Sequence, residues 1–179
     1  MAPYPGLTKQ DCEQAFLIAR ASLRAAAEMR GVANKFAGTF IVMDPFAQPS
    51  SNDPALVSLE EAYGAILFER RVDDAYPDAS NYDKVALAKA RDLWVLRALL
   101  GPNFTGRDVQ QHCPHLYRPG MTKWHGAVCR AGIVYAYSGV QGNYDEAFSA
   151  TAAEWLEAGS REAMTCKGGV MDVGGTLIG

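Results

Sequence analysis

Hydrophobic and polar positions follow two different periods along this chain, and these periods predict its helices and strands. Apolar residues recur at helical spacing in three segments, each running from a polar capping residue to a glycine. The predicted helices are Thr8 to Gly31, Ser80 to Gly101 and Asn143 to Gly159. The first helix opens with Thr8 and Asp11, which have the spacing of a capping box.

Four shorter runs of apolar and β-branched residues predict strands. They cover Gly38 to Asp44, Tyr63 to Arg71, Ala127 to Arg130 and Ile133 to Ser138. We interpret residues 46–62 as a loop that could contain one helical turn, and residues 160–179 as a glycine-rich tail. Short links within each strand pair favour antiparallel pairing with helices packed on the sheet. The sequence therefore predicts one α+β sandwich domain over residues 1–179.

Composition and charge exclude several function classes. The 179 residues carry a formal net charge of −3, which gives no general attraction to nucleic acid or to an anionic membrane. No apolar stretch approaches the ~20 residues that span a bilayer, and the first residues lack the pattern of a secretory signal. The four cysteines form no C-x-x-C pair, which favours reduced thiols. We therefore expect a cytoplasmic protein with neither a nucleic acid nor a membrane as partner.

All three histidines of the chain fall within residues 110–125. They are His112, His115 and His125, and two prolines and a glycine between them predict a loop. Histidine binds metals and haem and transfers protons near neutral pH, and loops on a rigid scaffold commonly carry sites. This segment is therefore the predicted functional site.

Two cofactors are compatible with this segment. His112, His115 and His125 could supply three ligands to Zn or Fe and leave one position open for a substrate. One of them could instead be the axial ligand of a haem, in an apolar slot formed with Tyr117 and Trp124. A site without a cofactor is the alternative, as are loop histidines that only cap backbone groups or fill a subunit interface.

Acid–base catalysis without a cofactor would need groups beyond the histidines. Strand alternation places Glu69, Arg71 and Asp73 on one face at the end of the second strand, although Arg71 and Asp73 could simply pair there. Lys89 on the second predicted helix is a further candidate, or a structural ion-pair partner. Cys113 is the candidate nucleophile among the thiols.

Several motifs in order resemble the GlcG/HbpS family. The motifs are Asp44 at a strand end, Phe68 to Ala75 with its Arg-x-Asp element, the Lys-Ala pair within Val85 to Ala90, the strand–turn–strand stretch Gly126 to Gly139, and the acidic pair in Asn143 to Ala147. The resemblance covers roughly residues 8 to 158.

This resemblance implies a profilin-like fold, with a five-stranded antiparallel sheet flanked by helices, and a homo-oligomer. It also implies haem binding, which some members show. We therefore expect a small-molecule-binding protein whose haem, tetrapyrrole or other aromatic ligand is held under residues 110–125, with Lys89, Tyr117, Trp124 and His125 as its contacts. The alternative is an isomerase, lyase or hydrolase on a small metabolite that uses histidine acid–base or histidine–metal chemistry in the same pocket.

Overall fold

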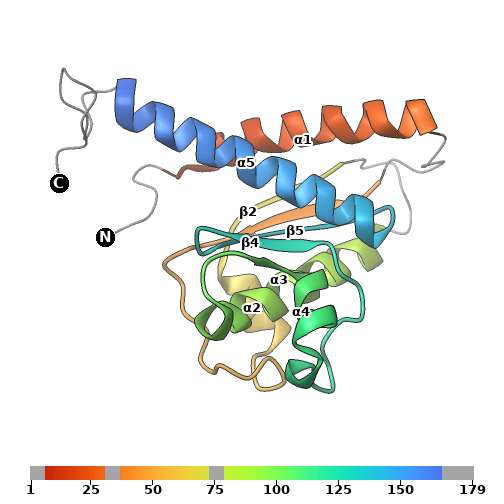
Figure 1. Cartoon of the computed structure of the whole chain (residues 1–179), viewed down its shortest axis with the longest axis vertical. Coiled ribbons are helices and arrows are strands. Elements are labelled where there is room, and N and C mark those ends of the chain that lie inside the picture. The colour runs from red at the N-terminus through yellow and green to blue at the C-terminus, as the bar shows by residue number, and fades with distance from the viewer. Residues whose placement is uncertain (1–6, 31–36, 73–78, 167–179) are drawn as a thin grey trace.

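A computed structural model describes residues 7–30, 37–72 and 79–166 (Figure 1). Its elements follow in the order α1 (Lys9–Arg30), β1 (Thr39–Met43), α2 (Leu59–Gly64), β2 (Ile66–Arg71), α3 (Ala79–Leu100), β3 (Phe104–Thr105), α4 (Gly106–His112), the 3₁₀ turn η1 (Pro114–Leu116), β4 (Ala127–Arg130), β5 (Ile133–Ser138) and α5 (Gly142–Cys166). The order agrees with the predicted helices and strands and adds β3, α4 and η1 between α3 and β4.

The strands form one antiparallel sheet in the order β2-β1-β5-β4-β3. The predicted hairpin is confirmed, because β4 and β5 pair around a turn in which Ala131 and Gly132 have φ angles of 47° and 82°. Strand β3 has only two residues, which is too short for a periodic signal. The α+β class and the five-stranded antiparallel sheet with flanking helices are thus confirmed.

Helices cover both faces of the sheet, as Figure 1 shows: α1 and α5 pack together on one face, and α2, α3 and α4 lie on the other. Side chains of β1 alternate between the two layers. Phe40 and Val42 join the core under α1 and α5, whereas Ile41 and Met43 join the core under α3. A strand buried on both faces is continuously apolar, which is why β1 was recognisable from the sequence.

The predicted second strand was wrong at its start. Tyr63 and Gly64 belong to α2, because Ser58 caps this short helix and accepts a hydrogen bond from the Glu61 amide at 3.0 Å. Residues 46–62 are therefore not wholly a loop. Strand β2 begins only at Ile66.

The predicted end of the third helix was also wrong. Helix α5 continues through Gly159 to Cys166, so residues 160–166 are helical rather than part of a tail, and residues 167–179 lie outside the described chain. Glycine within a helix costs only about 1 kcal/mol relative to alanine, and α5 gains more than that by packing along α1.

The predicted start of the first helix and the predicted end of the second helix are confirmed. Thr8 and Asp11 form the expected reciprocal pair, with the Thr8 amide donating to Asp11 Oδ2 at 2.8 Å and the Asp11 amide donating to Thr8 Oγ1 at 3.2 Å. Helix α3 ends at Leu100, before Gly101, whose φ is 85°. The predicted N-terminal cap of α3, Ser80, was wrong, because the helix already includes Ala79.

Candidate functional site

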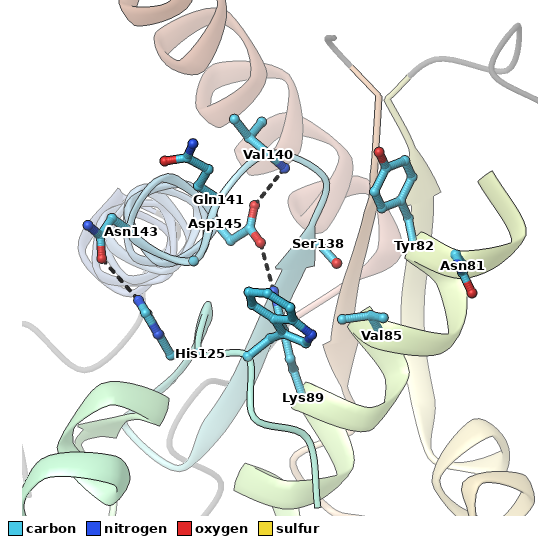
Figure 2. A pocket seen from close by; sticks show the side chains of 12 residues that line it. Asn81, Tyr82, Val85, Lys89, His125, Ser138, Val140, Gln141, Asn143 and Asp145 are labelled. Atoms are coloured by element: carbon cyan, nitrogen blue, oxygen red, sulfur yellow. Dashed lines mark hydrogen bonds and ion pairs between the residues drawn. The ribbon is translucent and has the colours of Figure 1, made fainter. Parts of the chain in front are cut away.

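A pocket of about 670 Å³ lies where α3, the start of α5 and the segment before β4 meet (Figure 2). We call it the α3–α5 pocket. The described residues that line it are Asn81, Tyr82, Val85, Lys89, Trp124, His125, Ser138, Val140, Gln141, Gly142, Asn143 and Asp145. Tyr82, Val85 and Lys89 are three or four residues apart on α3, so they share one helix face.

A buried ion pair forms the floor of the α3–α5 pocket. Lys89 Nζ lies 2.7 Å from Asp145 Oδ2 and donates to the Tyr137 carbonyl oxygen at 3.0 Å. The two charged side chains are only 2% and 6% exposed. Asp145 Oδ1 accepts a hydrogen bond from the Val140 amide at 3.0 Å. Both carboxylate oxygens therefore have partners, as a buried pair requires.

The protonation of Lys89 is set by two opposing effects. Burial lowers the pKa of Lys89, and the charge and hydrogen bond of Asp145 raise it again. An ammonium group has three N–H donors, and Asp145 and Tyr137 use two of them. No described residue accepts a hydrogen bond from the third donor, and Lys89 is among the residues that line the pocket.

Gly126 allows the chain to pass directly against this ion pair. Its φ is 132°, and a Cβ there would lie 2.6 Å from Asp145 Cβ and 2.8 Å from Lys89 Nζ. Ser149 Oγ donates to the Gly126 carbonyl oxygen at 2.8 Å and fixes the backbone at this point. No local sequence pattern predicts this role, because Asp145 and Lys89, which lie close to Gly126, come from α5 and α3.

His125 forms one wall of the α3–α5 pocket, and Figure 2 shows its ring turned toward Asn143. His125 Nε2 lies 3.0 Å from Asn143 Oδ1. The ring packs under Gly142, where a Cβ would come within 2.7 Å of ring atoms. Asn143, predicted as the cap of α5, lies inside its first turn instead, because the Tyr144 and Asp145 amides both donate to the Gln141 carbonyl oxygen.

The other two histidines do not join His125. His112 is the last residue of α4 and His115 lies in η1, and both are exposed. The loop prediction was wrong at its start, because Thr105 and Asp108 form a capping box that begins α4. Within the described ranges no group of three or more His, Cys, Asp or Glu side chains could hold a metal ion. The predicted three-histidine site for Zn or Fe is therefore not assembled.

Hydrogen bonds connect residues 120–122, which lie within the segment predicted to form the aromatic slot, to α3. Asp92 Oδ2 accepts a hydrogen bond from the Thr122 amide at 2.9 Å, and Arg91 Nη2 donates to the Gly120 carbonyl oxygen at 2.8 Å. Arg91 and Asp92 also pair with each other at 2.6 Å. Burial raises the pKa of Asp92, and Arg91 opposes this shift. These contacts hold residues 120–122 in place just before Trp124.

Three of the four predicted ligand contacts lie together. Trp124, His125 and Lys89 line the α3–α5 pocket, and the Trp124 side chain is 66% exposed. Tyr117 does not line this pocket, but it lines a small neighbouring cavity of about 10 Å³ together with Lys89, Trp124 and His125. Asp145 was not among the predicted site residues and entered the sequence analysis only as part of the acidic pair in Asn143 to Ala147. Tyr82 on α3 was not among the predicted site residues either.

The structure describes part of the predicted cluster at the end of β2. Arg71 and Thr39 both donate to the carboxylate of Asp83, so Arg71 at the end of β2 is paired with Asp83 on α3. Burial and the Asp83 charge raise the pKa of Glu69, which Arg71 opposes. Glu69 and Arg71 are not among the described residues that line the α3–α5 pocket. Asp73 lies outside the described residues.

Of Cys12, Cys113 and Cys129, Cys113 is expected to be the most reactive. Burial raises the pKa of Cys12 to about 12 and that of Cys129 to about 11, whereas Cys113 is only partly buried. Since the thiolate is the nucleophile, iodoacetamide at pH 8 should alkylate Cys113 at least ~10-fold faster than the other two. Peptide mass spectrometry of the native protein measures the rates. Equal labelling of Cys113 and Cys129 would contradict this.

Comparison of the chain with protein-family models, curated proteins and solved structures gives no match. The GlcG/HbpS-like resemblance therefore stays a prediction. Among the described residues, no helix combines the length and the hydropathy that crossing a bilayer requires. The geometry of the site combines an aromatic wall, a buried ion pair and one histidine.

Proposed function

We propose that the protein binds a small, flat organic molecule in the α3–α5 pocket. The observation that carries this proposal is the pocket itself, about 670 Å³ in volume, with Tyr82, Val85 and Trp124 along its walls and the Lys89–Asp145 pair at its floor. Small-molecule sites are concave and mostly apolar, with a few polar groups that orient the ligand. Aromatic walls favour a planar ligand, because rings stack.

The polar end of the pocket favours a carbonyl or carboxylate on that ligand. Lys89 has one N–H left to donate, and Gly142 and Asn143 are the first residues of α5. Amides in the first turn of a helix have no acceptor within the helix, and the helix dipole is positive at this end. Gly142 and Asn143 both line the pocket. An acceptor group would therefore meet donors from two elements.

The same geometry disfavours a haem that is bound through His125 Nε2. An axial ligand must present a nitrogen lone pair to the iron. His125 is the histidine of this pocket, and its Nε2 is turned to Asn143, 3.0 Å away. Haem ligation through Nε2 would require this contact to break and the ring to leave its place under Gly142.

The fold and assembly belong to the same proposal. The antiparallel sheet of five strands, with helices on both faces, supports a profilin-like domain of the GlcG/HbpS kind. The homo-oligomer that this resemblance implies stays a prediction. Native mass spectrometry of the purified protein gives the subunit number and any bound mass together.

Filling the pocket is expected to abolish binding. Val85 lines the pocket on α3, and Val85→Trp adds a ring to this space. We expect the affinity for aromatic acids to fall at least ~10-fold, a loss of about 1.4 kcal/mol. Ligand-observed NMR with a set of aromatic carboxylates measures this. Leu99→Trp is the matched control, because Leu99 is exposed on the same helix and does not line the pocket. Equal binding by Val85→Trp and the wild type would contradict the proposal.

Acid–base catalysis on the bound molecule is the second candidate function. The observation that favours it is Lys89, whose pKa is lowered by burial at the wall of a ligand-sized pocket. Groups with shifted pKa values in clefts are typical of catalytic sites. An isomerase or lyase of this kind would exchange a ligand C–H proton with solvent. NMR of bound ligands in D₂O tests this, and Lys89→Met should abolish the exchange.

A further inference from the structure

Asn143 lies between two nitrogen donors, and this fixes the direction of its amide. Its Oδ1 lies 2.9 Å from Arg107 Nη2 and 3.0 Å from His125 Nε2. A guanidinium can only donate hydrogen bonds, so the atom of Asn143 that faces Arg107 must be the oxygen. The same oxygen faces His125 Nε2, which must therefore carry a proton to make its hydrogen bond.

We propose that Arg107 and Asn143 hold His125 in the Nε2–H tautomer, so that Nδ1 is the lone pair that the α3–α5 pocket offers to its ligand. In neutral imidazole one nitrogen donates and the other accepts. No hydrogen bond to Nδ1 occurs in the described part of the chain. Arg107 and Asn143 are positioning residues, because they act through His125.

The contacts of Arg107 support this assignment. Arg107 Nη2 lies 3.2 Å from Glu146 Oε1 and is shared between Glu146 and Asn143. Arg107 Nε and Glu146 Oε2 are buried without hydrogen-bond partners among the described residues. The guanidinium therefore does not form the two parallel bonds that an arginine and a carboxylate favour. Its Nη2 instead lies within hydrogen-bond distance of both Glu146 and Asn143.

The tautomer of His125 points to a class of ligand, and this step rests on the proposed function. In this assignment Lys89 is a donor and His125 Nδ1 is an acceptor, and both residues line the α3–α5 pocket. A matching molecule carries an acceptor, such as a carboxylate, and a separate O–H or N–H donor. Hydroxy- or amino-substituted aromatic acids have this chemistry. Acids that lack the donor would leave Nδ1 without its partner in the complex, which weakens binding.

Nitrogen NMR tests the tautomer without any ligand. The chain has three histidines, so His112→Phe, His115→Phe and His125→Phe assign the imidazole signals of the ¹⁵N-labelled protein. At pH 8 we expect the His125 Nε2 signal to be protonated and the Nδ1 signal to be unprotonated. In Asn143→Ala and Arg107→Met both signals should move toward the average of two tautomers. An Nδ1–H tautomer in the wild type would overturn the inference, as would variants that leave both signals unchanged.

Ligand pairs then test the chemical class. The three hydroxybenzoate isomers are compared with their methyl ethers, which keep the carboxylate and lose the donor. We expect at least one hydroxy acid to bind ~10-fold more tightly than its ether, and this preference to disappear in His125→Phe but not in His115→Phe. Equal affinities for every pair would overturn the ligand class and leave the pocket proposal intact. No binding by any acid would contradict the proposed function, while the nitrogen signals still decide the tautomer.

Discussion

Lys89→Met is expected to lower the free energy of unfolding by about 3–5 kcal/mol. The substitution removes the charge that lies 2.7 Å from Asp145 and leaves this carboxylate buried, with the Val140 amide as its remaining partner among the described residues. Removing one member of a buried pair costs the desolvation energy of the other. Urea unfolding of both proteins, with equal slopes, gives the difference directly.

A second substitution separates this effect from lost packing. Asp145→Asn keeps an acceptor for the Val140 amide and removes the charge, so the Lys89→Met/Asp145→Asn double variant should recover at least ~2 kcal/mol. The Arg24–Glu28 pair is the exposed control, with both side chains 68% exposed. Arg24→Met should cost only about 0.5 kcal/mol. A Lys89→Met loss as small as this would show that the buried pair contributes little to stability.

Gly126→Ala is expected to be at least as damaging, with a loss of about 3 kcal/mol or more. A φ of 132° is strained for any residue with a Cβ, which costs about 1–3 kcal/mol. The new methyl would also lie 2.6 Å from Asp145 Cβ and 2.8 Å from Lys89 Nζ. The strand and the ion pair must therefore separate. Thermal and urea unfolding measure the loss.

Gly120→Ala is the matched control for Gly126→Ala. Gly120 also has a positive φ, 91°, but a Cβ there meets nothing within 4 Å. It should show the backbone cost alone, about 1–2 kcal/mol. Equal losses in the two variants would mean that the contact with the ion pair adds nothing. A larger loss for Gly126→Ala, together with lost ligand binding, would support its role in building the pocket floor.

The sequence predicted most of the fold because its signals were local. The Thr8–Asp11 cap, the hairpin around Gly132 and the stop at Gly101 are each set by a few neighbouring residues. Errors arose where tertiary packing outweighed local preference. Because α5 packs against α1, this helix continues past Gly159. The two-residue strand β3 forms because it pairs with β4.

The candidate site was predicted only in part. Chemistry singled out His125, Trp124 and Lys89, and the structure brings these residues together. Grouping His112 and His115 with His125 failed because α4 and η1 place the first two at the surface. Asp145 was missed because its partner Lys89 is 56 residues away. Contacts between residues so far apart in the sequence depend on the order of the strands in the sheet, and no local sequence pattern predicts this order.

A crystallographic fragment screen tests the central claim most directly. Crystals of the wild-type protein are soaked with planar aromatic acids, and electron density shows where they bind. The account predicts that fragments gather in the α3–α5 pocket, with their rings against Trp124 and a carboxylate oxygen near Lys89 Nζ. Fragments that gather instead in the groove between α1 and α5, beside Trp155, while the α3–α5 pocket stays empty, would contradict it.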